Sequence, residues 1–134
     1  MRPAASNKSK VVIGLGDEPE SVTLLGQVVG KAGYTFFGTT SGPECLSLLS
    51  RIEPRLILLD VQMPGMDGFE TCRHIRKDAR LARVPIAFLT ALKRPADVQA
   101  GMAAGGNDFI LKPFNPVVLL NRVNHWTSQR LTNI

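Results

Sequence analysis

The feature that most limits the possible folds is a fivefold alternation of short apolar runs with segments of helical periodicity. The run LILL at 56–59 is apolar on both faces, which is typical of a central strand in a parallel sheet. Alternation of this kind favours a doubly wound α/β fold, with five parallel strands flanked by five helices. We expect strands at 11–13, 34–39, 56–59, 85–89 and 109–111, and helices that begin near Pro19, Gly42, Phe69, Ala96 and Pro116.

The composition fits one compact domain. The chain has 134 residues, of which 44% are hydrophobic and 20% charged. It contains no apolar run of membrane-spanning length, and its first residues lack the apolar segment of a secretion signal, so we expect a cytoplasmic protein without membrane contact. We assign residues 1–9 to a flexible tail, residues 10–128 to the domain and residues 129–134 to a second tail.

Charge and cysteine content exclude some classes of function. The formal charge of +5 is not arranged as a basic stripe with interleaved aromatic residues, so direct contact with nucleic acid is not expected. Cys45 and Cys72 lack the spacing of a metal or redox motif, and we interpret them as reduced, partly buried thiols.

Polar residues follow four of the predicted strands. Asp17-Glu18 comes after the first strand, Asp60 after the third, Thr90 after the fourth and Lys112 after the fifth. Because ligands of open parallel sheets bind at the carboxyl ends of the strands, these side chains should share one site. Carboxylates are suitable ligands for Mg²⁺, and a carboxylate can also accept a phosphoryl group as a nucleophile. An ammonium and a hydroxyl group are suited to binding phosphoryl oxygens.

These residues lie in four motifs through which the chain resembles the response-regulator receiver family of two-component systems, over about residues 10–128. The motifs are Asp17-Glu18-Pro19, the stretch LDVQMPGMDG at 59–68, Thr90-Ala91, and the stretch FILKPF at 109–114. The resemblance implies a flavodoxin-like, CheY-like fold with strand order 2-1-3-4-5. It also implies a signalling protein that takes up and loses its phosphoryl group by self-catalysis, and not an enzyme in the usual sense.

The resemblance assigns a role to each residue of the expected site. Asp60 matches the phosphoacceptor, and Asp17 matches the acid that binds Mg²⁺ directly. The backbone carbonyl of Gln62 would be a further metal ligand, and Thr90 and Lys112 would bind the phosphoryl oxygens.

The resemblance further implies a switch and its partners. Thr90 and Phe109 match a hydroxyl and aromatic pair that rearranges on phosphorylation, and the Lys112-Pro113 bond matches one that is usually cis. The phosphoryl group would come from a sensor histidine kinase or a phosphotransfer protein. A downstream protein or output domain would bind the face formed by the fourth helix, the fifth strand and the fifth helix.

One position departs from the family pattern. The family usually has two adjacent acids after the first strand, and Gly16 stands where the first of them belongs. Either the site holds its metal with one carboxylate fewer, which we favour, or Glu18 partly substitutes. A degenerate receiver, which binds partners without taking up phosphate, is the alternative function that this glycine leaves open.

Three other interpretations compete with these assignments. Asp17 could serve as a helix N-cap before Pro19. The Gly14-Leu15-Gly16 turn resembles a nucleotide- or flavin-binding turn, but Pro19 stands at the third glycine position and the neighbouring acids would repel a pyrophosphate. An aspartate-nucleophile phosphatase would need a second acid where the chain has Gln62.

Overall fold

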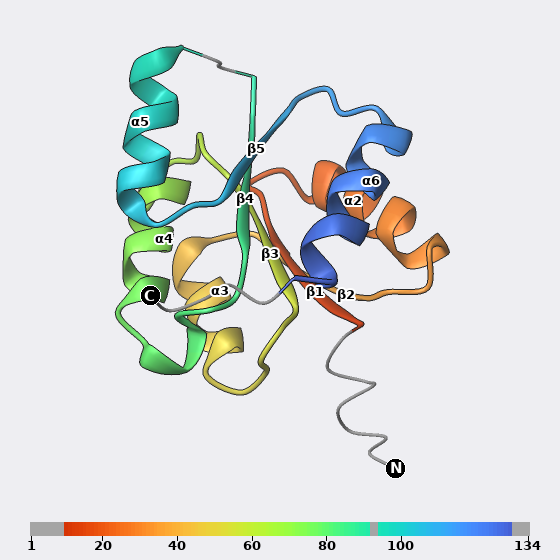
Figure 1. Ribbon diagram of the computed structural model, residues 1–134, viewed down its shortest axis with the longest axis horizontal. Helices are drawn as coiled ribbons and strands as arrows, with labels where there is room; N and C mark the ends of the chain where they lie inside the picture. Colours follow the sequence, from red (N-terminus) through yellow and green to blue (C-terminus); the bar gives the residue numbers. More distant parts are fainter. Residues whose placement is uncertain (1–9, 92–93, 130–134) are drawn as a thin grey trace.

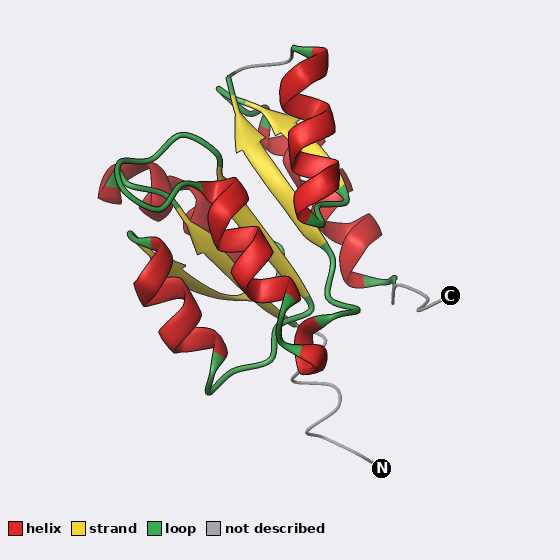
Figure 2. Cartoon of the chain, turned by 90° about the vertical axis from the view of Figure 1, so that its left-hand side faces the viewer, coloured by secondary structure: helices red, strands yellow, loops and turns green. Residues whose placement is uncertain are grey.

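The computed structural model describes residues 10–91 and 94–129, which form a five-stranded parallel sheet between two layers of helices (Figures 1 and 2). The strand order is β2-β1-β3-β4-β5, as expected. The strands are β1 (Val11–Leu15), β2 (Thr35–Thr39), β3 (Leu56–Asp60), β4 (Ile86–Thr90) and β5 (Asp108–Leu111). The helices are α2 (Pro19–Lys31), α3 (Gly42–Leu49), α4 (Gly68–Arg76), the short 3-10 helix η1 (Ala79–Leu81), α5 (Pro95–Ala104) and α6 (Pro116–Thr127).

Each face of the sheet has its own apolar core. One core lies under α3, α4 and α5, and the other lies under α2 and α6. All five residues of β3 are buried, because this strand has neighbours on both sides and helices on both faces. The sequence prediction missed η1. The predicted tails at 1–9 and 130–134 lie outside the described residues. None of the helices in the described part is long and apolar enough to cross a membrane.

The ring of Phe36 leaves no room for a side chain at three neighbouring glycines. The ring of Phe36 lies so close to Gly14, Gly26 and Gly38 that a Cβ atom on these residues would approach it to 2.7, 2.7 and 3.1 Å respectively. Gly14 lies within β1 and not in a turn, so its small size serves packing between strand and helix. The first glycine of Gly14-Leu15-Gly16 therefore serves packing inside a strand and does not form a nucleotide-binding turn.

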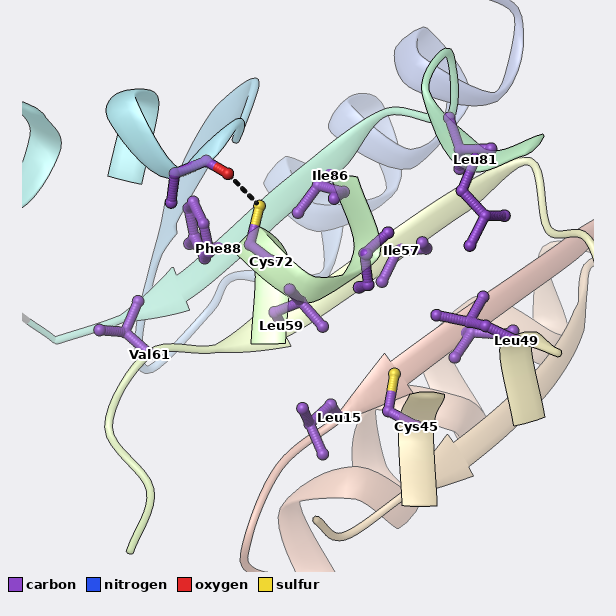
Figure 3. Close-up of a cluster of buried hydrophobic side chains, with 14 residues drawn as sticks. Leu15, Cys45, Leu49, Ile57, Leu59, Val61, Cys72, Leu81, Ile86 and Phe88 are labelled. Carbon is purple, nitrogen blue, oxygen red and sulfur yellow. Dashed lines mark hydrogen bonds between the residues drawn. The ribbon is translucent and has the colours of Figure 1, made fainter. Parts of the chain in front are cut away.

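The two cysteines are more buried than we expected. Cys45 and Cys72 are free thiols with no exposed surface, and both belong to the core under α3, α4 and α5 (Figure 3). Burial raises the pKa of each thiol to about 11, because the charged thiolate loses its hydration. The thiol of Cys72 also donates a hydrogen bond to the carbonyl of Ala104 at 3.3 Å. The prediction of partly buried thiols is wrong in this respect.

Arg76, the last residue of α4, joins three segments by hydrogen bonds to main-chain and amide oxygens. Its guanidinium donates to the carbonyls of Gly105, Leu81 and Val84 at 2.9, 2.9 and 2.7 Å, and to Oδ1 of Asn107 at 3.0 Å. Burial lowers the pKa of this guanidinium, again by desolvation. The side chain thus fixes α4 against the segment between α5 and β5.

We predict that Arg76→Met lowers the free energy of unfolding by about 3 kcal/mol, because several buried oxygens lose a charged donor. Arg73→Met is the matched control, since Arg73 is exposed on the same helix and should change the stability by about 0.5 kcal/mol or less. Urea denaturation of the two variants measures the difference. Equal stabilities would mean that the bonds of Arg76 do not hold these segments together.

Candidate functional site

A largely buried ion pair lies at the carboxyl edge of the sheet. Asp60 is the last residue of β3 and only 6% exposed. Its Oδ2 accepts a hydrogen bond from Nζ of Lys112 at 2.9 Å, across 52 residues of sequence, and its Oδ1 accepts one from the backbone N–H of Gln62 at 3.3 Å. The structure therefore brings together Asp60 and Lys112, as the strand ends predicted.

Lys112 is held in place by its own backbone. Its N–H donates to the carbonyl of Thr90 at 2.9 Å, which continues the pairing of β4 with β5 by one residue. The Lys112-Pro113 peptide bond is cis, as expected. Thr90 closes β4 and is 2% exposed. The ends of β4 and β5 thus place a hydroxyl-bearing residue and an ammonium at the same edge as Asp60.

Gly68 contributes to the site in a way that the sequence prediction did not recognise. A Cβ atom on this residue would lie 2.3 Å from the carbonyl oxygen of Asp60 and 3.0 Å from Cα of Val61. Only glycine therefore lets the first turn of α4 approach the end of β3 this closely. The preceding Asp67 caps α4, because its Oδ1 accepts a hydrogen bond from the N–H of Glu70 at 2.8 Å. The glycine is visible in the sequence MDG at 66–68, but the reason for it is a contact with the end of β3 on the other side of the loop.

The carboxylates available to a metal are few. Asp17 lies two residues beyond β1 and is exposed. The N-cap position of α2 is Glu18, without a side-chain cap bond, so the alternative role of Asp17 as N-cap is wrong. In residues 10–91 and 94–129, no three His, Cys, Asp or Glu side chains group as a metal site would require. The predicted ligands, which are the carboxylates of Asp17 and Asp60 and the carbonyl of Gln62, are nevertheless of a kind that suits Mg²⁺. This hard cation commonly keeps several of its waters.

Gly16 lies directly beside the phosphoacceptor candidate. The register pairs Leu15 with Leu59, and a Cβ atom on Gly16 would be 3.7 Å from Oδ2 of Asp60 and 3.2 Å from Cγ2 of Val22. The φ angle of Gly16 is not among the positive ones, so its backbone conformation is open to other residues. A carboxylate at this position would therefore face Asp60, and the present chain has one negative charge fewer there.

The predicted switch residues lie on the same face of the sheet. Phe109 pairs in register with Phe88, and Leu111 pairs with Thr90, so Phe109 and Thr90 are diagonal neighbours on adjacent strands. The rings of Phe109 and Phe88 have centroids 5.3 Å apart. Phe109 is half-buried, whereas Phe88 has no exposed surface.

Comparison with known proteins agrees with this geometry. A family model described as the response regulator receiver domain matches residues 12–124. This chain belongs to that family. A relative of this receiver is the Response regulator PleD of Caulobacter vibrioides, 35% identical over 120 residues that cover 90% of the chain and 26% of PleD. The chain spans about a quarter of the length of PleD (26%) and about half of the Transcriptional regulatory protein GltR of Pseudomonas aeruginosa (49%).

Two solved structures illustrate the similarity. The chemotaxis protein CheY4 of Vibrio cholerae has a TM-score of 0.84 and 30% identity, and the match covers 86% of this receiver and 96% of CheY4. The receiver domain of the sensor histidine kinase PA1611 from Pseudomonas aeruginosa has a TM-score of 0.83 and 28% identity, with coverage of 90% and 98%. That structure has a magnesium ion coordinated in the active site cleft.

We predict that Gly16→Asp lowers the metal-free stability of this receiver by about 1 to 2 kcal/mol relative to Gly16→Asn, because two carboxylates then face each other. Asparagine has nearly the same size without the charge, so contact with Val22 affects both variants alike. The difference should grow as the pH rises through the carboxyl range and the added acid loses its proton. Thermal unfolding without metal, between pH 3 and pH 7, measures it.

Mg²⁺ should largely offset this loss of stability in Gly16→Asp. The added carboxylate should tighten Mg²⁺ binding about tenfold, or roughly 1.4 kcal/mol, relative to asparagine. Titration followed by NMR measures this affinity. Equal affinities in well-folded variants would show that residue 16 does not reach the metal site, or that Glu18 already acts there.

Proposed function

We propose that this receiver accepts a phosphoryl group on Asp60 from a sensor histidine kinase or a phosphotransfer protein, with Mg²⁺, in the cytoplasm. The observation that carries the proposal is the buried carboxylate of Asp60 in contact with Nζ of Lys112 at the carboxyl edge of the sheet. Burial of a charge is unfavourable without compensation, so a functional role best explains why an aspartate follows four buried apolar residues.

The residues of this chain divide the work of the transfer. A carboxylate oxygen of Asp60 forms the new bond to phosphorus, while the bond from phosphorus to the donor breaks and its electron pair leaves with the donor. Lys112 moves from Asp60 to a phosphoryl oxygen, and the Thr90 hydroxyl donates to another. Asp17, Asp60 and the Gln62 carbonyl would hold Mg²⁺, which would neutralise phosphoryl charge; the magnesium ion in the active site cleft of the PA1611 receiver supports a metal at this place. Water later attacks phosphorus, the bond between phosphorus and the Asp60 oxygen breaks, and inorganic phosphate leaves, so that Asp60 returns to the carboxylate by self-catalysis.

Phosphorylation would change a surface formed by α5, β5 and α6. When Thr90 turns toward the phosphoryl group, Phe109 moves toward Thr90, and the population shifts between two packed states. A groove of about 490 Å³ lies on this surface, and its lining includes Met102, Leu111 and Val118, which are 50%, 44% and 46% exposed. Exposed apolar residues grouped in this way favour a protein partner or an output domain as the ligand.

Phosphorylation itself can be tested directly. With Mg²⁺ and acetyl phosphate, intact-mass analysis should show the addition of one phosphoryl group, and Asp60→Asn should abolish it. Asp97→Asn is the control, because Asp97 is an acid outside the predicted set of site residues and pairs with Arg94 at the start of α5. An unmodified wild-type protein, under conditions that phosphorylate another receiver, would favour the degenerate receiver instead.

The switch can be tested with a phosphoryl mimic. Beryllofluoride with Mg²⁺ should move amide NMR signals around Asp60 and also those of Phe109 and the groove residues, because the two regions are coupled through Thr90. Phe109→Ala should leave the signals near Asp60 responsive while reducing the response of the groove. Changes confined to the site in the wild-type protein would contradict the coupling and leave phosphoryl acceptance intact.

A further inference from the structure

Gly101 lies in the middle of α5, buried against three aromatic rings. A Cβ atom on this residue would lie 2.4 Å from Cζ of Phe109, 3.0 Å from Cε2 of Phe88 and 3.1 Å from Cε1 of Phe69. The first of these distances is far shorter than van der Waals contact. The absence of a side chain on Gly101 is therefore what allows the ring of Phe109 to lie against α5.

The three rings form a continuous stack from α4 through β4 to β5. Phe69 meets Phe88 edge-on, with centroids 5.0 Å apart, and Phe88 meets Phe109 at 5.3 Å. Phe88 is fully enclosed, whereas Phe109 is half-buried on the edge strand. Phe69 is also half-buried, but it lies in α4, whereas Phe109 lies on an edge strand as a diagonal neighbour of Thr90. Because close-packed interiors resist displacement, Phe109 and not Phe88 is the ring on the sheet that has room to move.

We propose that Gly101 is a positioning residue of the switch: it provides the place on α5 that the Phe109 ring occupies in the resting state. The inference rests on the proposed function. When Phe109 moves toward Thr90, the ring leaves Gly101, and α5 loses the contact that set its distance from β5. The position of α5 thereby depends directly on the position of one ring.

Helical propensity supports a packing role for this glycine. Glycine is less favourable than alanine inside a helix, so its presence in α5 needs another cause. The chain offers two comparisons in α2. A Cβ atom on Gly30 would meet no atom within 4 Å, whereas one on Gly26 would lie 2.7 Å from Cδ2 of Phe36, on the other face of the sheet. Gly30 is thus a control for the change in helix propensity alone. Gly26 is a control for a methyl group that is crowded by an aromatic ring.

The experiment compares Gly101→Ala with Gly30→Ala and Gly26→Ala, all without phosphoryl mimic. Overpacking commonly lowers the population of the overpacked state about tenfold or more, and here that state is the resting one. In Gly101→Ala, the ring signals of Phe109 and the amide signals of α5 and β5 should therefore move toward the positions that beryllofluoride produces in the wild type. Gly26→Ala should lower stability without this movement, and Gly30→Ala should produce neither effect.

A double variant identifies the ring responsible. In Gly101→Ala/Phe109→Ala, the added methyl group meets no ring from β5, so the spectrum should match that of Phe109→Ala alone. Should Gly101→Ala fail to fold, the double variant should recover the fold, because the closest contact has been removed. A double variant that is also unfolded would overturn the proposal.

The remaining outcomes separate this inference from the proposed function. If wild-type protein responds to beryllofluoride but Gly101→Ala leaves the Phe109 ring in place, the role of Gly101 is wrong and the switch stands. The same holds if Gly26→Ala moves the signals equally. If wild-type protein does not respond at all while Gly101→Ala displaces Phe109, the contact is real and the proposed phosphoryl switch is wrong.

Discussion

The arrangement of this receiver depends on how a buried carboxylate is compensated. Asp60 ends a strand with no exposed apolar residue, and its partner Lys112 follows a strand that lies two places away in the sheet. The pair forms only because parallel crossovers bring the ends of β3, β4 and β5 to the same edge. Breaking such a pair by removing one partner is much more costly than losing a surface ion pair. The topology of the sheet is therefore what makes this contact possible.

The same contact bears on the missing acid. With Gly16 in place of a carboxylate, Asp60 faces a lysine on one side and no fixed negative charge at residue 16. The resting site is thus closer to electrical balance than a site with two adjacent acids after β1. Such a site would depend little on a bound cation for folding. It would depend on the cation mainly when a phosphoryl group adds negative charge. Binding of metal and binding of phosphate would accordingly depend on each other more strongly here.

The sequence predicted the fold and the meeting of Asp60 with Lys112, because both follow from local patterns. Apolar runs ending in Asp60 and Thr90 locate strand ends, and parallel topology then brings those ends together. The close contacts at Gly68 and Gly101 were not predicted, since each involves atoms from a distant segment. Burial of Cys45 and Cys72 was underestimated for a similar reason, because a helical pattern tells which face is apolar but not how completely other elements cover it. The role of Arg76 depends on carbonyls, which leave no trace in side-chain patterns.

The enclosure of the two thiols has a practical consequence. Burial raises the pKa of each thiol to about 11, so both thiols stay protonated at neutral pH, and neither has surface through which a reagent could reach it. The folded protein should therefore not react with sulfhydryl reagents. Cysteines introduced at two chosen exposed positions would be labelled selectively, so distances between helices can be followed by spectroscopy without first removing the natural cysteines from the core.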